Sequence, residues 1–223
     1  MQVVTLALAC FGIVVLLLAL SRWLAHRRWA SAGHLALALA LLLSAAWIRP
    51  VAANLATYDV RHAQRPVAQI YCERTSSRSY RVTLTRLPGG RMQVFEVLGD
   101  EWRIDARTLD WQGPAVDLGL HASYRLDRLS TRFVREPESD APPSSYVLSD
   151  DDTGTDVWAQ ARTGGFWSNY AHADHAYGPW QPLADGARFD VTFDRGRLAA
   201  RAANEPAAKA LAAAPAAGAV PAR

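Results

Sequence analysis

The sequence predicts two N-terminal transmembrane α-helices that form a hairpin, followed by a mainly β soluble domain built as an antiparallel sandwich or a small barrel. Three observations lead to this fold class. Two apolar stretches lie near the N-terminus, residues 67–201 alternate between polar and apolar side chains, and turn residues separate the alternating runs. The 223 residues suffice for one ordinary domain and an anchor.

The two apolar stretches are residues 3–20, which carry no charge, and residues 30–48, which only His34 interrupts. A bilayer core about 30 Å thick requires roughly 20 apolar residues in a helix, so both stretches are long enough to span it. A cleaved signal peptide has a basic n-region and a shorter apolar core. Because no Lys or Arg precedes Arg22, we expect two membrane helices instead.

The chain has two cysteines, Cys10 and Cys72. Cys10 follows Leu-Ala, so cleavage as a lipoprotein is the less favoured alternative; most of the apolar core lies after this cysteine rather than before it. We expect no disulfide between the two, because Cys10 belongs to the first helix and Cys72 to the soluble domain. Cys72 should pack as a small apolar residue.

Basic residues are concentrated in the segment SRWLAHRRW between the two apolar stretches, which contains Arg22, Arg27 and Arg28. Short basic loops remain in the cytoplasm. The hairpin loop should therefore face the cytoplasm and both chain ends the periplasm, although Arg49, Arg61 and Arg65 act weakly against this orientation. The sequence predicts a two-pass protein of the bacterial inner membrane with a periplasmic domain.

Charge is distributed unevenly along the chain. Residues 1–66 contain six Arg and one Asp, for a net charge of +5, whereas the remainder contains 18 basic and 20 acidic side chains, for a net charge of −2. The excess of positive charge therefore belongs to the anchor and its flanks, and we expect no nucleic-acid partner for the soluble domain.

The soluble domain should contain six to eight short antiparallel strands. The clearest pair is a hairpin of residues 79–86 and 91–99 around the turn sequence LPGG. Residues 101–111 and 123–134 each contain a slip in the alternation, and we attribute the first slip to a β-bulge. The expected strands are residues 67–73, 79–86, 91–99, 101–111, 123–134, 146–149 and 187–193.

The remaining segments have weaker patterns. Residues 156–170 predict a short amphipathic helix that Gly164 and Gly165 interrupt. The Ala- and Pro-rich residues 202–223 should be disordered. The predicted organisation of the chain is a transmembrane hairpin (1–49), a polar linker (50–66), a periplasmic mainly β domain (67–201) and a disordered tail (202–223).

The acidic string SDDDTGTDV, residues 149–157, is the sharpest local motif. Its Asp-Asp-Thr-Gly-Thr core is similar to the phosphorylated-aspartate motif of haloacid-dehalogenase-like phosphatases and ion-pumping ATPases. That chemistry requires Mg²⁺ and a doubly wound α/β domain, whereas the pattern here is antiparallel β. We interpret Asp150, Asp151 and Asp152 as a solvated turn; a weak cation site and a metal-dependent hydrolase are the alternatives.

The string HADH contains His172, Asp174 and His175. A metal site usually needs three or four converging ligands, and His121 is the one other histidine of residues 67–201. Two histidines three residues apart point to opposite faces of a strand. We interpret the string as a polar surface loop and predict neither a metal nor a cofactor.

The segments WRIDAR and YRLDR alternate Arg with Asp. We expect these side chains to form cross-strand ion pairs on an exposed sheet face, with a polar contact surface for a partner as the alternative. Trp102 and Trp111 bracket the most regular strand. We expect both in the core, with a partner-binding surface as the alternative.

The stretch LPGGRMQVFEVLGDEWRIDARTLDW, together with YRLDRLSTRF and YGPWQPLADGARFDV, resembles a poorly characterised proteobacterial inner-membrane family whose members are often labelled "cation/multidrug efflux pump". The resemblance covers roughly residues 80–195 and implies an N-terminal hydrophobic anchor, but no known chemistry. The residues that match the family pattern are Gly99, Asp100, Trp102, Asp105, Ala106, Arg107, Trp111, Tyr124, Leu126, Asp127, Arg128, Leu129, Tyr177, Gly178, Asp185, Gly186 and Ala187.

Two helices are too few for the alternating-access path of a transporter, and neither predicted span contains Asp, Glu, Lys or Arg for a proton relay. We therefore predict a non-enzymatic, membrane-anchored periplasmic domain that binds another cell-envelope component. Its partners would be the lipid bilayer and another inner-membrane or envelope protein. An accessory or regulatory subunit of a multidrug/cation efflux system is the alternative. The residues expected to serve the core or the contact surface are Trp102, Asp105, Arg107, Trp111, Tyr124, Asp127, Arg128, Tyr177, Asp185 and Gly186.

Overall fold

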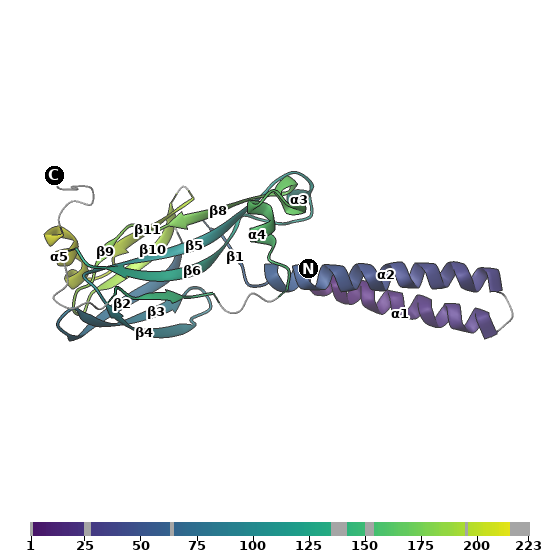
Figure 1. Ribbon diagram of the computed structural model, residues 1–223, viewed down its shortest axis with the longest axis horizontal. Helices are drawn as coiled ribbons and strands as arrows, with labels where there is room; N and C mark the ends of the chain where they lie inside the picture. The colour runs from purple at the N-terminus through teal and green to yellow at the C-terminus, as the bar shows by residue number, and fades with distance from the viewer. Residues whose placement is uncertain are drawn as a thin grey trace. The chain divides into compact units, whose positions relative to one another are not determined.

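A computed structural model describes the chain over residues 2–24, 28–62, 65–134, 142–149, 154–194 and 196–214. The chain divides into two compact units. The first unit contains residues 1–59 and 151–168, and the second contains residues 60–150 and 169–223. The first unit is helical and the second is mainly β (Figure 1).

Two long helices, α1 (Gln2–Leu24) and α2 (Arg28–Leu55), run antiparallel and side by side in the first unit (Figure 1). Small residues form the seam between them. Ser31, Ala38 and Ala45 are at most 5% exposed and recur every seven residues along α2. This spacing keeps one stripe of a helix facing its partner in a left-handed pair.

The remaining surface of the two helices is apolar and exposed, as Leu17, Leu39 and Leu43 illustrate, each more than half exposed. Both helices are long and apolar enough to cross a membrane, by length and composition. The core helix of a soluble protein would bury most of its apolar side chains, whereas these helices present them outward. Two membrane-spanning candidates near the N-terminus are therefore present, as predicted.

The second helix is longer than its apolar stretch predicts. It continues through Pro50 to Leu55, so the linker expected from residue 50 is wrong for its first six residues. Pro50 ended the predicted helix because proline lacks an N–H, but a helix tolerates that loss where neighbouring groups compensate.

The first unit also contains α4 (Val157–Arg162) and the short 3-10 helix η1 (Phe166–Asn169). The Asp156 carboxylate caps α4 by accepting a hydrogen bond from the Ala159 N–H at 2.9 Å. Gly164, with φ +80°, follows the end of the helix. The predicted short helix with a break at the glycine pair is confirmed.

The second unit is a sandwich of two antiparallel sheets that do not close into a barrel (Figure 1). One sheet has the order β1-β6-β5-β8, with β7 beside β6 and β9 beside β5, and the other has the order β11-β10-β2-β3-β4. Its strands are β1 (Asp59–Val60), β2 (Pro66–Ser76), β3 (Ser79–Arg86), β4 (Met92–Leu98), β5 (Glu101–Trp111), β6 (Ser123–Arg132), β7 (Ser145–Val147), β8 (Ala171–Tyr177), β9 (Gln181–Pro182), β10 (Arg188–Asp194) and β11 (Arg197–Ala202). The helices α3 (Pro114–Asp117) and α5 (Glu205–Ala213) complete the unit.

Alternating side chains of both sheets form the core between them. Trp102 packs edge-on against Phe189, with ring centroids 5.4 Å apart, and both are at most 1% exposed. Cys72 is fully buried beside them, and burial raises the pKa of its thiol to about 12. The predicted apolar role of Cys72 is confirmed, and so is the fold class.

Two local predictions are wrong, and a third is right only in part. A register shift is present at Asp105 and Ala106 of β5, as the predicted bulge requires, but the extra residue, Asp127, belongs to β6, and β5 continues opposite β8 without a shift. The HADH string is not a surface loop but part of β8, which pairs with β5 and buries Ala171, Ala173 and Ala176. Residues 205–213 of the predicted disordered tail form α5, which Asn204 caps and which buries Ala207 in the core.

A candidate interaction surface on the β8 edge

An arginine–aromatic cluster lies on the outer face of the first sheet. Trp180 contacts two guanidinium groups, with Arg103 4.6 Å and Arg132 4.5 Å from its ring centroid. Arg103 also lies 5.3 Å from the ring centroid of Tyr177. Cation–π contacts of this kind hold aromatic rings in fixed orientations at the surface. We call these four residues, with His175, the Arg–Trp cluster.

The strand pairing explains why these residues meet. Trp102 of β5 lies opposite Gln181 of β9, so the preceding and following residues, Trp180 and Arg103, are neighbours across the same ladder. Arg103 points outward because Trp102 on its neighbouring position points into the core. Arg132 reaches the cluster from β6, where it forms an ion pair with Glu101 at 2.6 Å.

Gly178 allows the chain to turn from β8 towards β9 directly over β5. Its N–H donates to the Ile104 carbonyl at 2.9 Å. A Cβ at this position would lie 2.6 Å from the same carbonyl oxygen, closer than real contacts allow. Gly178 therefore brings Tyr177 and Trp180 onto the same part of the sheet face.

Tyr177 is the most exposed aromatic ring of the cluster, at 57% exposure. Its ring stacks on His175, with centroids 5.6 Å apart and planes at 25°. Tyr177 and His175 also line a groove of about 500 Å³ between β8 and β11, the edge strands of the two sheets. Arg197 and Leu198 line the opposite side of this groove. The cluster thus continues into a concave surface with mixed polar and apolar walls.

Two buried carboxylates hold arginines on this sheet face: Asp105 holds Arg103 of the cluster, and Asp127 holds Arg107, which lies opposite His175. Asp105, only 5% exposed, lies 3.0 Å from the Arg103 guanidinium, and Asp127, 9% exposed, lies 2.9 Å from Arg107. Burial raises the pKa of the Asp105 carboxyl above its ordinary 3.8, and the charge and hydrogen bond of Arg103 oppose this shift, together with Gly178 and His175. The ion pairs orient both arginines without removing the aromatic rings from solvent.

The predicted ion pairing of the alternating Arg and Asp side chains is confirmed, but the prediction that they lie on an exposed sheet face is wrong for the two carboxylates. The cross-strand pair is Arg107–Asp127, whereas Asp105 pairs with Arg103 on its own strand. Both carboxylates are buried because they lie on central strands. Asp105 is on β5, flanked by β6 on one side and by β8 and β9 on the other, and Asp127 is on β6, flanked by β5 on one side and by β1 and β7 on the other.

The structure distributes the other predicted site residues over several roles. Trp102 and Tyr124 are core residues, at 1% and 3% exposure, but Trp111 is half-buried at the end of β5 and lies outside the core cluster, contrary to prediction. Asp185 accepts a hydrogen bond from the Arg74 backbone N–H at 2.8 Å, and Gly186 occupies a turn with φ +68°.

Arg128 is exposed and donates to the Ser145 hydroxyl at 3.1 Å. Of the predicted residues, Asp105, Arg107, Asp127 and Tyr177 therefore lie in or beside the Arg–Trp cluster. The list of expected site residues missed Arg103, Arg132, Trp180 and His175, although the segments WRIDAR and HADH contain Arg103 and His175. Their proximity depends on the pairing of β5 with three other strands, and local sequence patterns carry no signal for that pairing.

The structure tests the metal hypotheses at the residues that it describes. Among the described residues, no group of three or more His, Cys, Asp or Glu side chains is close enough to hold a metal ion. His172 and His175 lie on one strand, β8, and His121 is exposed. Asp150, Asp151 and Asp152 lie outside the described residues, so the solvated turn and its alternatives there stay predictions.

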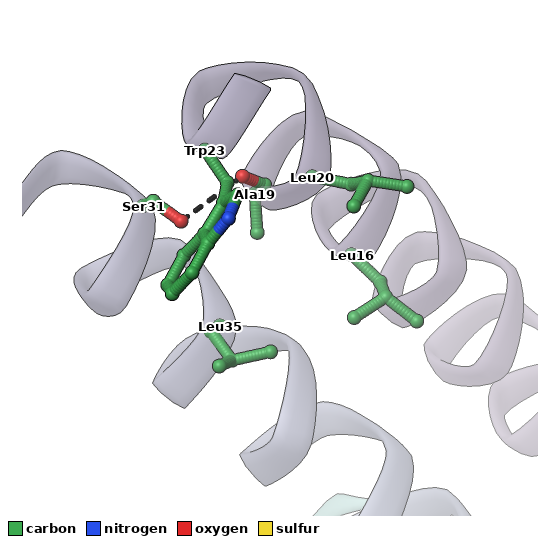
Figure 2. A pocket seen from close by; sticks show the side chains of 6 residues that line it. All are labelled: Leu16, Ala19, Leu20, Trp23, Ser31 and Leu35. Atoms are coloured by element: carbon green, nitrogen blue, oxygen red, sulfur yellow. Dashed lines mark hydrogen bonds between the residues drawn. The ribbon is translucent and has the colours of Figure 1, made fainter. Parts of the chain in front are cut away.

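A second hollow, of about 230 Å³, opens between α1 and α2 (Figure 2). Leucine side chains and Trp23 line it, and the Ser31 hydroxyl on its wall donates to the Ala19 carbonyl at 3.1 Å. The hydroxyl therefore already serves the packing of the two helices. We take the Arg–Trp cluster as the candidate site, because it presents exposed polar and aromatic groups that can recognise a ligand.

No family model matches this sequence, and no curated protein or solved structure shows a significant match to it. The functional argument therefore depends on the residues and their geometry alone.

Proposed function

We propose that this chain is a two-pass inner-membrane protein whose β domain lies in the periplasm and has a non-catalytic binding role. The domain would bind another component of the cell envelope through the Arg–Trp cluster and the adjoining groove. The observation that carries this proposal is the contact of Trp180 with both Arg103 and Arg132, together with the exposed ring of Tyr177 beside Arg103.

The composition of the cluster supports a binding role. Trp, Tyr and Arg are the residue types that contribute most to the affinity of protein interfaces. Trp and Tyr bury large areas with few rotatable bonds lost, and Arg offers a planar fork of hydrogen-bond donors. Ion pairs with Asp105 and Glu101 hold the arginines in place before a partner arrives. Such preorganisation lowers the entropic cost of association.

Site-specific photo-crosslinking in intact cells tests this proposal. The photoreactive amino acid p-benzoylphenylalanine would replace Tyr177 in one variant and Tyr71 in the control. Tyr71 is also exposed, also on a strand, and lies beside one guanidinium, that of Arg188 at 5.8 Å, but it belongs to the other sheet.

We expect a discrete crosslinked product from position 177, and none from position 71. The same product should disappear when Arg103→Ala is added to the position-177 variant. Equal products from both positions, or none from position 177, would contradict the proposed surface. A transporter recovered as the crosslinked partner would favour the accessory role in efflux over other envelope functions.

The proposed orientation has its own test. A reporter that is active only outside the cytoplasm, fused after Ala214 so that α5 stays in place, should be active. The same reporter inserted within residues 21–29 should be silent, because the loop between the helices is basic. The reversed pattern would place the β domain in the cytoplasm.

A further inference from the structure

The segment of α4 and η1 packs against the C-terminal end of α2, more than a hundred residues earlier in the sequence. The Val157 N–H donates to the Asn54 side-chain oxygen at 3.3 Å, and the Thr155 N–H donates to the Pro50 carbonyl at 3.3 Å. A Cβ at Gly154 would collide with this carbonyl, so only glycine permits the approach. Asn54 is fully buried by the contact.

Three aromatic rings meet at this contact. Phe166 packs edge-on against Trp47 of α2, with ring centroids 6.2 Å apart, and Trp167 packs edge-on against Phe166 at 5.3 Å. Trp47 and Phe166 nevertheless remain 61% and 56% exposed. Large apolar rings that lie together and stay more than half exposed are typical of a surface that contacts a membrane or another molecule.

The position of Trp47 along α2 indicates the partner. Within the candidate membrane span of α2, Ser31–Leu55, Trp47 lies 16 residues after the start, about 24 Å along a helix that rises 1.5 Å per residue, and the uncharged apolar stretch ends at Ile48. Arg49 follows directly. A tryptophan between an apolar span and an arginine occupies the headgroup boundary of a bilayer about 30 Å thick.

We propose that Phe166 and Trp167 insert into the headgroup boundary of the same bilayer that α2 crosses. Phe166 contacts Trp47 and therefore lies at the same depth. The segment would form a second, interfacial membrane contact beside the hairpin, with its exposed rings solvated by lipid. This inference depends on the proposed membrane anchorage of α1 and α2.

Depth-dependent fluorescence quenching of the full chain in lipid nanodiscs tests the insertion. An environment-sensitive fluorophore is attached to the Phe166→Cys variant in a Cys10→Ser background; Cys72 is fully buried and stays unlabelled. The matched control is Gln160→Cys, an exposed polar position on α4 itself. The nanodiscs carry nitroxide lipids labelled at the headgroup, near the top of the acyl chain or near its end.

Labelled Cys10 in the otherwise unaltered chain reports on the anchor, because Cys10 is exposed in the middle of α1. If the anchor is right, this probe is quenched most by the deepest nitroxide. If the inference is also right, the probe at position 166 is quenched by the two shallow nitroxides at least about two-fold more than the probe at position 160. Trp167→Cys provides a second reading if the Phe166 variant misfolds.

Two other outcomes overturn the inference and are distinguishable. A quenched Cys10 probe with equal, weak quenching at positions 166 and 160 would leave the anchor intact and exclude the interfacial contact. An unquenched Cys10 probe would show that the hairpin is not in the bilayer, and the inference would fail with the anchor.

Discussion

The two outer faces of the β sandwich use the same chemistry in different surroundings. On the sheet that contains β3, Arg81 pairs with Glu73 at 3.6 Å and Glu96 at 3.0 Å, and all three side chains are about half exposed. On the other sheet, the carboxylates of Asp105 and Asp127 are buried beneath their arginines. Water screens the first set of ion pairs, whereas the second set depends on its partners for solvation.

One outer face therefore carries ion pairs in contact with water, and the other carries buried ion pairs that hold neighbouring side chains in place. Exposed ion pairs contribute little to stability and restrain no neighbouring ring. The buried pairs fix Arg103 and Arg107, and Arg103 in turn orients Trp180 and Tyr177. Hence the candidate binding surface lies on the face with buried charges, and the opposite face serves as its control in the experiments below.

The largest loss of stability is expected at Trp102, which lies in the core between the two sheets. Trp102→Ala should lower the free energy of unfolding by about 3–5 kcal/mol, because it leaves a cavity beside Phe189. Trp111→Ala should cost only about 1–2 kcal/mol, since Trp111 lies half-buried outside the core. Thermal melts of both variants in detergent measure the difference. Equal losses in the two variants would show that Trp111 is a core residue.

Removing one carboxylate from each face sharpens the comparison directly. Asp127→Ala should cost about 1–3 kcal/mol, because it leaves Arg107 without its partly buried partner carboxylate. Glu96→Ala should change the free energy of unfolding by less than about 0.5 kcal/mol, because Glu96 is exposed. Denaturant titrations of the two variants decide this. Similar losses in the free energy of unfolding for the two variants would show that the ion pairs of the two faces do not differ.

The pH dependence of stability reports on Asp105. Its folded-state pKa is raised, so the folded state retains this proton more strongly than the unfolded state. The contribution of Asp105 to the free energy of unfolding should therefore be constant below the ordinary pKa of 3.8 and decline as pH rises from there through the raised pKa. Asp105→Asn should abolish that decline. Parallel curves for the variant and the unaltered chain would show that Asp105 is not desolvated.

Much of the fold could be predicted from local patterns. The strand of residues 101–111 was predicted with its observed bounds because alternation and burial agree there, and the hairpin around LPGG was predicted because its turn residues are local signals. The end of α2 was missed because proline stops most helices but not this one. Strand β8 was missed because its inward side chains are mostly alanines, which have little strand preference.

The candidate site was predictable only in part. Asp105, Arg107 and Tyr177 were among the site residues expected from the sequence. Arg103, Trp180 and Arg132 meet through pairings between strands that are far apart in sequence. No periodicity encodes such a meeting. The periplasmic location, the binding role and the efflux connection remain predictions from the sequence.

One measurement tests most directly whether the Arg–Trp cluster binds rather than stabilises. Trp180→Ala is introduced into the variant with the photoreactive residue at position 177, and crosslinking yield and thermal melt are measured on the same preparation. Trp180 is partly exposed and outside the core, so its loss should cost about 1 kcal/mol or less. We predict a nearly unchanged melt and loss of the crosslinked product. An unchanged yield with a strongly lowered melting temperature would show that the cluster serves the fold and not a partner.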